Sequence, residues 1–207
     1  EEEGEEDEEQ PPRVSTGGHK SRGAPVPAPV PVQAKPYVFL SHTWATDLLG
    51  RDTHARVAKM NEQILAQNID TWLDTQGDMK DNTLQAMTEG IEACDLIIIF
   101  VTRAYIDKCK KKDNDNCKLE FEYAYNRKKV NNLIAVVMEP DCANPGSWDG
   151  PVGAALASQL YVDCKGDTDA DFERALDDIE ARIKQRAAAS PLSSPPAARI
   201  HAPHTHR

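Results

Sequence analysis

The sequence lacks the features that mark several large classes of protein. No apolar run approaches the roughly 18 residues of a membrane-spanning helix, so we expect no membrane span. Its five cysteines are odd in number and form no CxxC pair, which is typical of reduced thiols in the cytoplasm rather than of a disulfide framework or a zinc site. Neither GxGxxG nor GxxxxGKS/T occurs, which excludes the usual glycine-rich nucleotide-binding loops. The missing GxSxG motif disfavours an α/β-hydrolase.

Basic residues are also in short supply. The formal net charge is −10 at pH 7. Acidic residues outnumber basic ones in the body of the chain as well as in the N-terminal run Glu1–Glu9, which has no basic residue. A negatively charged chain is poorly suited to binding phosphate backbones, so we expect no nucleic-acid partner.

Composition divides the chain into three parts. Residues 1–35 are an acidic block followed by a Pro/Ala/Val-rich segment, in which frequent proline prevents a packed core. Residues 187–207 are rich in Ala, Pro and His, and we assign no metal site to these histidines. Both ends are expected to be disordered tails. Residues 36–186 hold the apolar runs, and their number fits one domain.

The unbroken apolar run Leu96–Val101 indicates a strand that is buried on both faces. Such a strand needs helices on both sides of a mostly parallel sheet. Further expected strands are Tyr37–Ser41, Thr71–Leu73, Leu133–Met138 and Leu160–Asp163. Helical patterns lie between them, near residues 53–67, 82–94, 103–109 and 116–129, with a last helix capped by Thr168 and a long loop from Pro140 to the fifth strand. The sequence therefore predicts a doubly wound α/β domain.

In such sheets, ligands bind in the crevice beyond the carboxyl ends of the strands. An acidic magnesium pocket of the response-regulator type is excluded there, because the first and third strands end in Ser41-His42 and Thr102-Arg103. A flavodoxin phosphate loop is disfavoured because Trp44 occupies a place that needs a small residue. Residues 113–116 lack the glycine and glutamate spacing of a calcium loop.

Glu120 is the remaining candidate for chemistry. It lies about one turn into a helix whose expected N-cap is Asp115 or Asn116, so the helix dipole should favour its ionised form. Its helical neighbours Cys117 and Ala124 are small and leave room over its face. An ionised carboxylate suits a cationic, oxocarbenium-like sugar centre. From the pattern alone, a structural or solvated glutamate stays open as the alternative.

Four segments in order carry a resemblance to a known family. They are Tyr37–Trp44, Asp70–Asp74 with the Gly77-Asp78 loop after it, Ile91–Thr102, and Asp107–Cys109 followed by Asn116–Glu120. Over residues 36–186 the chain resembles TIR (Toll/interleukin-1 receptor) domains, particularly the NAD-hydrolysing TIR proteins of the animal axon-degeneration type.

The resemblance implies a flavodoxin-like sheet of five parallel strands in the order 2-1-3-4-5. It also implies a NAD⁺ nucleosidase that cleaves the nicotinamide–ribose bond, with NAD⁺ as the substrate and no further cofactor. By the same resemblance Glu120 is the catalytic residue. The residues expected to border the nucleotide are Ser41, His42 and Trp44 after the first strand, and Gly77, Asp78 and Met79 in the loop after the second.

The resemblance further implies intracellular signal transduction, as in innate immunity, and self-association or binding to other TIR domains. Some TIR domains are adaptors without catalysis, and this alternative stays open because fold does not establish activity. The chain also departs from the family where many members have tryptophan and this one has Asn116. Trp72 is expected to belong to the core, whereas His42 either contacts substrate or caps the sheet.

Overall fold

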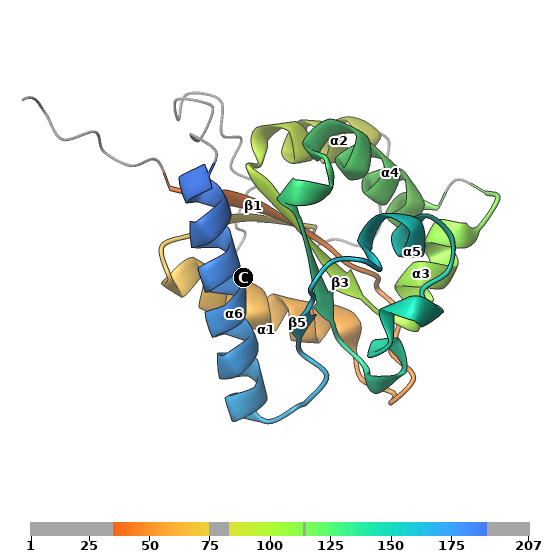
Figure 1. Ribbon diagram of the computed structural model, residues 1–207. Coiled ribbons are helices and arrows are strands. Elements are labelled where there is room, and N and C mark those ends of the chain that lie inside the picture. Colours follow the sequence, from red (N-terminus) through yellow and green to blue (C-terminus); the bar gives the residue numbers. More distant parts are fainter. Residues whose placement is uncertain (1–34, 75–82, 114, 190–207) are drawn as a thin grey trace, which may run out of the picture. The chain divides into compact units, whose positions relative to one another are not determined.

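The structure is a computed structural model that describes residues 35–74, 83–113 and 115–189 (Figure 1). Its sheet has five parallel strands in the order β2-β1-β3-β4-β5. These strands are β1 (Tyr37–Ser41), β2 (Asp70–Leu73), β3 (Leu96–Val101), β4 (Leu133–Val137) and β5 (Val162–Asp163). The predicted fold class and strand order are confirmed.

Six α-helices occur in the described residues. They are α1 (Thr53–Ala66), α2 (Thr83–Ala93), α3 (Arg103–Lys110), α4 (Asn116–Lys128), α5 (Gly150–Leu156) and α6 (Asp169–Ala189). Short 3-10 turns are η1 (Val130–Asn132), η2 (Pro140–Cys142) and η3 (Pro145–Ser147). None of the described helices is long and apolar enough to cross a bilayer.

The prediction of a long loop after Pro140 is wrong in part, because this stretch contains η2, η3 and α5. Prolines and glycines suggested irregular backbone there. Pro151, however, stands in the first turn of α5, where its missing N–H costs no helical hydrogen bond. The prolines of η2 and η3 likewise stand at the start of their turns.

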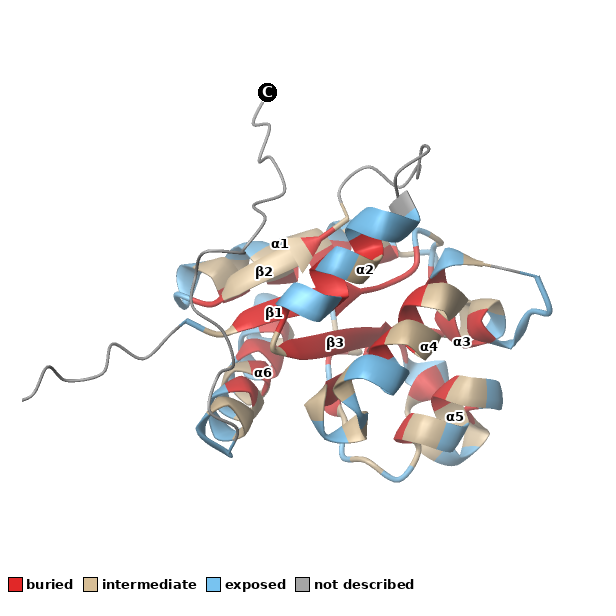
Figure 2. Ribbon diagram, turned by 90° about the horizontal axis from the view of Figure 1, so that it is seen from above, coloured by how far each residue is buried: buried red, intermediate tan, exposed pale blue. Residues whose placement is uncertain are grey.

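Alternate strand residues face opposite sides of the sheet and build two separate apolar clusters. One side, covered by α2, α3, α4 and α5, includes Phe39, Ile97, Ile99 and Phe121. The other side, covered by α1 and α6, includes Leu40, Ile98, Met60 and Ile179. All six residues of β3 are buried, and Figure 2 shows this strand running through the interior. Its continuous apolar run therefore reflects burial on both faces.

Side-chain caps fix where the helices begin at the carboxyl edge of the sheet. Asp52 accepts a hydrogen bond from the Ala55 amide and so starts α1, and Thr102 accepts one from Tyr105 and starts α3. Asp115 accepts one from the Cys117 amide and starts α4, which confirms one of its two predicted N-caps. The predicted cap Asn82 lies outside the described residues.

Candidate functional site

The side chain of Ser41, the last residue of β1, lies against Glu120 of α4. Its hydroxyl donates a hydrogen bond of 2.8 Å to Glu120 Oε2. The same hydroxyl oxygen is 2.9 Å from the hydroxyl of Tyr105, which comes from α3. All three side chains are buried. Three elements that are remote in sequence thus converge on one carboxyl group.

Burial controls the ionisation of Glu120 in this ligand-free structure. It raises the pKa of the carboxyl from its ordinary 4.5 to about 8, although the Ser41 hydrogen bond acts in the opposite direction. The expectation that the helix dipole keeps Glu120 ionised is therefore wrong here. Glu120 lies beyond the first helical turn, where the dipole field has faded. The capping carboxylate of Asp115 further disfavours a second negative charge.

Two histidines and a tryptophan form a second group after the end of β1. His42, buried after β1, has its Nε2 atom 2.7 Å from Nδ1 of His54 in the first turn of α1. Trp44 stacks on the His54 ring with 3.6 Å between the ring centroids, while 41% of its surface stays exposed. Burial lowers the pKa of His42 to about 4 and also lowers that of His54. Both rings are therefore neutral at pH 7.

Of the predicted neighbours of Glu120, Ser41 contacts it directly, whereas His42 and Trp44 group with His54. In this structure the Nε2 atom of His42 is occupied by His54. His54 and Tyr105 were missed by sequence reasoning. No signal in the sequence separates them from an ordinary exposed histidine and an ordinary core tyrosine.

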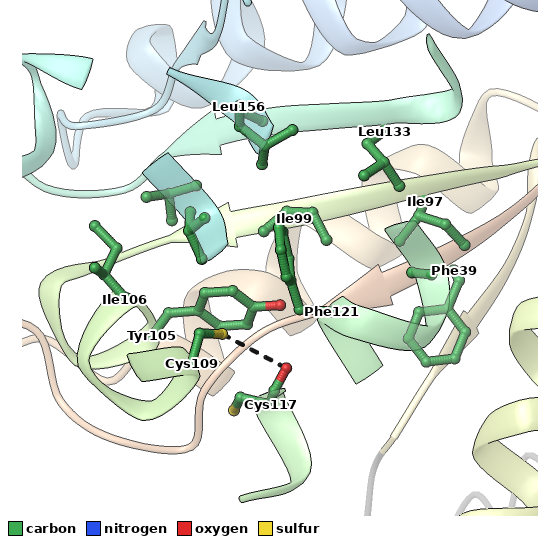
Figure 3. Packing of buried hydrophobic residues seen from close by; sticks show 14 of the residues in the cluster. Phe39, Ile97, Ile99, Tyr105, Ile106, Cys109, Cys117, Phe121, Leu133 and Leu156 are labelled. Carbon is green, nitrogen blue, oxygen red and sulfur yellow. Dashed lines mark hydrogen bonds between the residues drawn. The ribbon is translucent and has the colours of Figure 1, made fainter. Parts of the chain in front are cut away.

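Cysteine thiols join α3 and α4 to the end of β1. Cys117 donates a hydrogen bond from Sγ to the carbonyl oxygen of His42, at 3.5 Å. Cys109 donates likewise to the carbonyl oxygen of Cys117, at 3.6 Å, as drawn in Figure 3. All five cysteines are free and buried, and burial raises the pKa of Cys109 to about 12. The thiols of Cys109 and Cys117 are neutral groups that pack near Glu120.

The loop between β1 and α1 is held by buried charges. The side chain of Asp47 accepts hydrogen bonds from the amides of Leu49 and Arg51 and from the Arg51 guanidinium. Glu139, after β4, accepts a hydrogen bond of 2.7 Å from the Leu48 amide. The loop therefore presents the exposed side chains of Leu48 and Leu49 on a fixed backbone.

Gly77, Asp78 and Met79, predicted to border the nucleotide, lie outside the described residues. Asp74, just before them, raises the pKa of Glu120, so a residue after β2 does act on the site. Trp72 stacks on Phe39 with 4.3 Å between the ring centroids and packs against the core, as predicted.

Chemically, the edge of the sheet combines the buried carboxyl of Glu120 with the partly exposed ring of Trp44. An ionised Glu120 would stabilise a positive charge placed beside it. Trp44 offers a flat surface for a planar ring.

Comparison with known proteins supports the fold and the family. A family model described as TIR domain matches residues 38–179. A crystal structure of a prokaryotic SEFIR domain is similar to this chain with a TM-score of 0.54 and 17% sequence identity, covering 72% of this chain and 99% of that one. A comparison with curated protein sequences gives no match. Because the family model spans well over half of the sequence, this chain belongs to the TIR domain family, whose fold serves as a signalling module.

Proposed function

We propose that this TIR domain is a NAD⁺ nucleosidase with Glu120 as its catalytic residue. The observation that supports the proposal is the buried carboxyl of Glu120, oriented by Ser41 at the carboxyl edge of the sheet. This is the edge at which sheets of this topology bind ligands, close to the point where the strand order reverses between β1 and β3.

The reaction breaks the bond between C1′ of the ribose and the nicotinamide nitrogen. The bonding electron pair leaves with neutral nicotinamide, and positive charge develops on the ribose, where an ionised Glu120 would stabilise it. Water then adds to C1′ and loses a proton, so that NAD⁺ and water give nicotinamide, ADP-ribose and H⁺. The exposed face of Trp44 would stack on a ring of the dinucleotide.

The protonated state of the ligand-free site is compatible with this role. NAD⁺ carries a positive charge on its nicotinamide ring. A cation beside a carboxyl group lowers its pKa, so bound substrate would convert Glu120 from its raised pKa of about 8 towards the ionised form. Binding and ionisation would therefore be coupled.

The test compares wild-type protein with Glu120→Gln, at high concentration and clustered on beads, by chromatography of nicotinamide released from NAD⁺. We expect turnover by the wild type and loss of at least a hundredfold in the variant, since one electrostatic stabiliser contributes about that factor. Glu122→Gln is the matched control, because it makes the same change on the same helix at a half-buried position. Equal turnover by Glu120→Gln would remove Glu120 from the mechanism.

A second candidate is an interaction module without catalysis. Two exposed apolar side chains on the fixed β1–α1 loop favour it, with 65% of Leu48 and 59% of Leu49 accessible. The partner would be another TIR domain, in the first instance a second copy of this chain. Absence of nicotinamide release by clustered wild-type protein would favour this candidate over the enzyme.

A further inference from the structure

We propose that Tyr105 is a positioning residue for Glu120, because its hydroxyl holds the Ser41 hydroxyl as a donor to the ionised carboxylate. The inference rests on the proposed function of Glu120. It begins from a chain of hydrogen bonds that runs from Tyr105 through Ser41 to Glu120 Oε2.

The direction of this chain follows from counting hydrogen atoms. An ionised carboxylate only accepts hydrogen bonds, and a serine hydroxyl has a single hydrogen to donate. When Ser41 donates to ionised Glu120, its oxygen must therefore accept from Tyr105. Both bonds then point towards the negative charge. Successive bonds of this kind polarise and strengthen one another, most strongly when the final acceptor is charged.

The surroundings of Tyr105 leave its hydroxyl few alternatives. Its side chain is fully buried, and the ring lies among Ile106, Cys109 and Phe121 in the core (Figure 3). Of these, only Cys109 has a polar atom. Its thiol also interacts with the Tyr105 hydroxyl, but a thiol is a weak hydrogen-bond partner. Burial raises the pKa of the Tyr105 hydroxyl well above its ordinary value, so this group stays protonated and available as a donor.

Other titratable groups also act on Glu120 and must stay constant in any test. Asp74 after β2 and Asp115 at the start of α4 raise its pKa, and Lys108 on α3 lowers it. The nearby thiols of Cys109 and Cys117 are neutral because burial raises their pKa values. None of these groups is removed by a change at Tyr105 or Ser41.

The experiment is a titration of the glutamate side-chain carboxyls by ¹³C NMR in the full chain, with the Glu120 signal assigned from Glu120→Gln. Tyr105→Phe keeps the ring and removes the hydroxyl. We expect it to raise the Glu120 pKa by about 0.5, which leaves roughly threefold less ionised carboxylate at neutral pH. Ser41→Ala should raise this pKa by about 1, and adding Tyr105→Phe to Ser41→Ala should raise it no further.

Two control variants separate positioning from packing. Ile106→Val creates a small cavity in the apolar cluster that holds Tyr105 and removes no polar atom, so it should leave the Glu120 pKa unchanged. Tyr123→Phe removes a tyrosine hydroxyl that donates to Glu92 at the surface and should also have no effect. If Tyr105→Phe does not fold, incorporation of 3-fluorotyrosine keeps the ring and makes the hydroxyl a stronger donor. It should then lower the Glu120 pKa.

Turnover provides the second readout. Relative to wild type, kcat/KM of Tyr105→Phe should fall about threefold at pH 7 and recover at a pH well above 9, because a loss of ionised form is restored by alkali. An unchanged Glu120 pKa in Tyr105→Phe, or an equal rise in the Ser41→Ala background, would overturn the inference. If the wild type released no nicotinamide, the proposed function would fail, and the NMR titration would still decide the role of Tyr105.

Discussion

Ser41 and Glu120 lie 79 positions apart in the sequence, and a hydrogen bond of 2.8 Å joins their side chains. This bond favours the ionised carboxylate, whereas burial of the same carboxyl disfavours it, and burial has the larger effect. The ligand-free site is therefore mostly protonated at neutral pH. The raised pKa should affect the pH dependence of both turnover and stability.

The first prediction concerns the pH dependence of NAD⁺ turnover. If the ionised carboxylate is required, kcat/KM should rise with pH and level off above an apparent pKa of about 8, the value for Glu120, because kcat/KM reports the free enzyme. His42 and His54 titrate below this range because burial lowers their pKa values. Nicotinamide release measured at fixed ionic strength from pH 6 to 9.5 checks this prediction. A flat profile would contradict the need for an ionised Glu120.

The second prediction concerns stability. The folded protein holds the proton of Glu120 up to a pKa of about 8, whereas an unfolded chain releases it near 4.5. This contribution to stability is complete below pH 4.5 and is lost as pH rises through 8. Glu120→Gln has no such proton to lose. As pH rises, the unfolding free energy of the wild type should therefore fall relative to that of Glu120→Gln, by at most about 5 kcal/mol.

Urea unfolding at pH 5 and at pH 9 measures this difference. Glu122→Gln serves as the control, because its half-buried side chain lies on the same helix without the burial of Glu120. An advantage of Glu120→Gln that stayed constant over this range would show that Glu120 does not retain its proton in the folded protein.

The sequence was most informative where one physical cause dominates. Burial on both faces forces an unbroken apolar run, so β3 and β4 could be recognised and the sheet built around them. The seven-residue helix α5 was missed because Gly150, Pro151 and Gly153 obscure any helical pattern. A short helix with such residues is stabilised by packing, here through the buried side chains of Val152 and Leu156.

The candidate site could be proposed from the sequence, but its electrostatics could not. Glu120 could be identified from its place in a resemblance that spans the domain. The contact of Tyr105 with Ser41 and the raised pKa of Glu120 depend on how α3, α4 and β1 pack together, and no local pattern encodes this. His54 likewise gains its position beside His42 and Trp44 only because the capped start of α1 turns back over the end of β1.

The third prediction concerns the charges that hold the β1–α1 loop. The side chain of Asp47 is 1% exposed. Its carboxylate lies 2.7 Å from the Arg51 guanidinium and 3.7 Å from that of Arg56. Asp47→Ala would remove the buried carboxylate from these guanidinium groups, which keep Asp167 and backbone carbonyls as partners. The loss should lower the unfolding free energy by about 1–3 kcal/mol. Chemical denaturation measures this loss. Asp169→Ala, which breaks an exposed pair with Lys59, should cause little change, because solvent screens such pairs.

The fourth prediction addresses the second candidate function. If Leu48 and Leu49 form part of a contact between two copies of this chain, the double variant Leu48→Ser/Leu49→Ser should weaken self-association. The side chains of both residues point to solvent, while their amides are held by Glu139 and Asp47, so the variant should keep the loop conformation. Burial of each leucine contributes roughly 1.5–3 kcal/mol, which corresponds to at least a tenfold change in the dissociation constant.

Sedimentation velocity over a concentration series measures this change. Leu160→Ser is the matched control, because Leu160 is 84% exposed just before β5, away from the β1–α1 loop in the sequence. A control that weakens association as much as the double variant would point to general loss of apolar surface rather than to this loop. If the double variant self-associates as the wild type does, the contact must use other residues. Nicotinamide release by the clustered double variant separates the two candidate functions, because a catalytic site at Glu120 should remain active when these leucines are replaced.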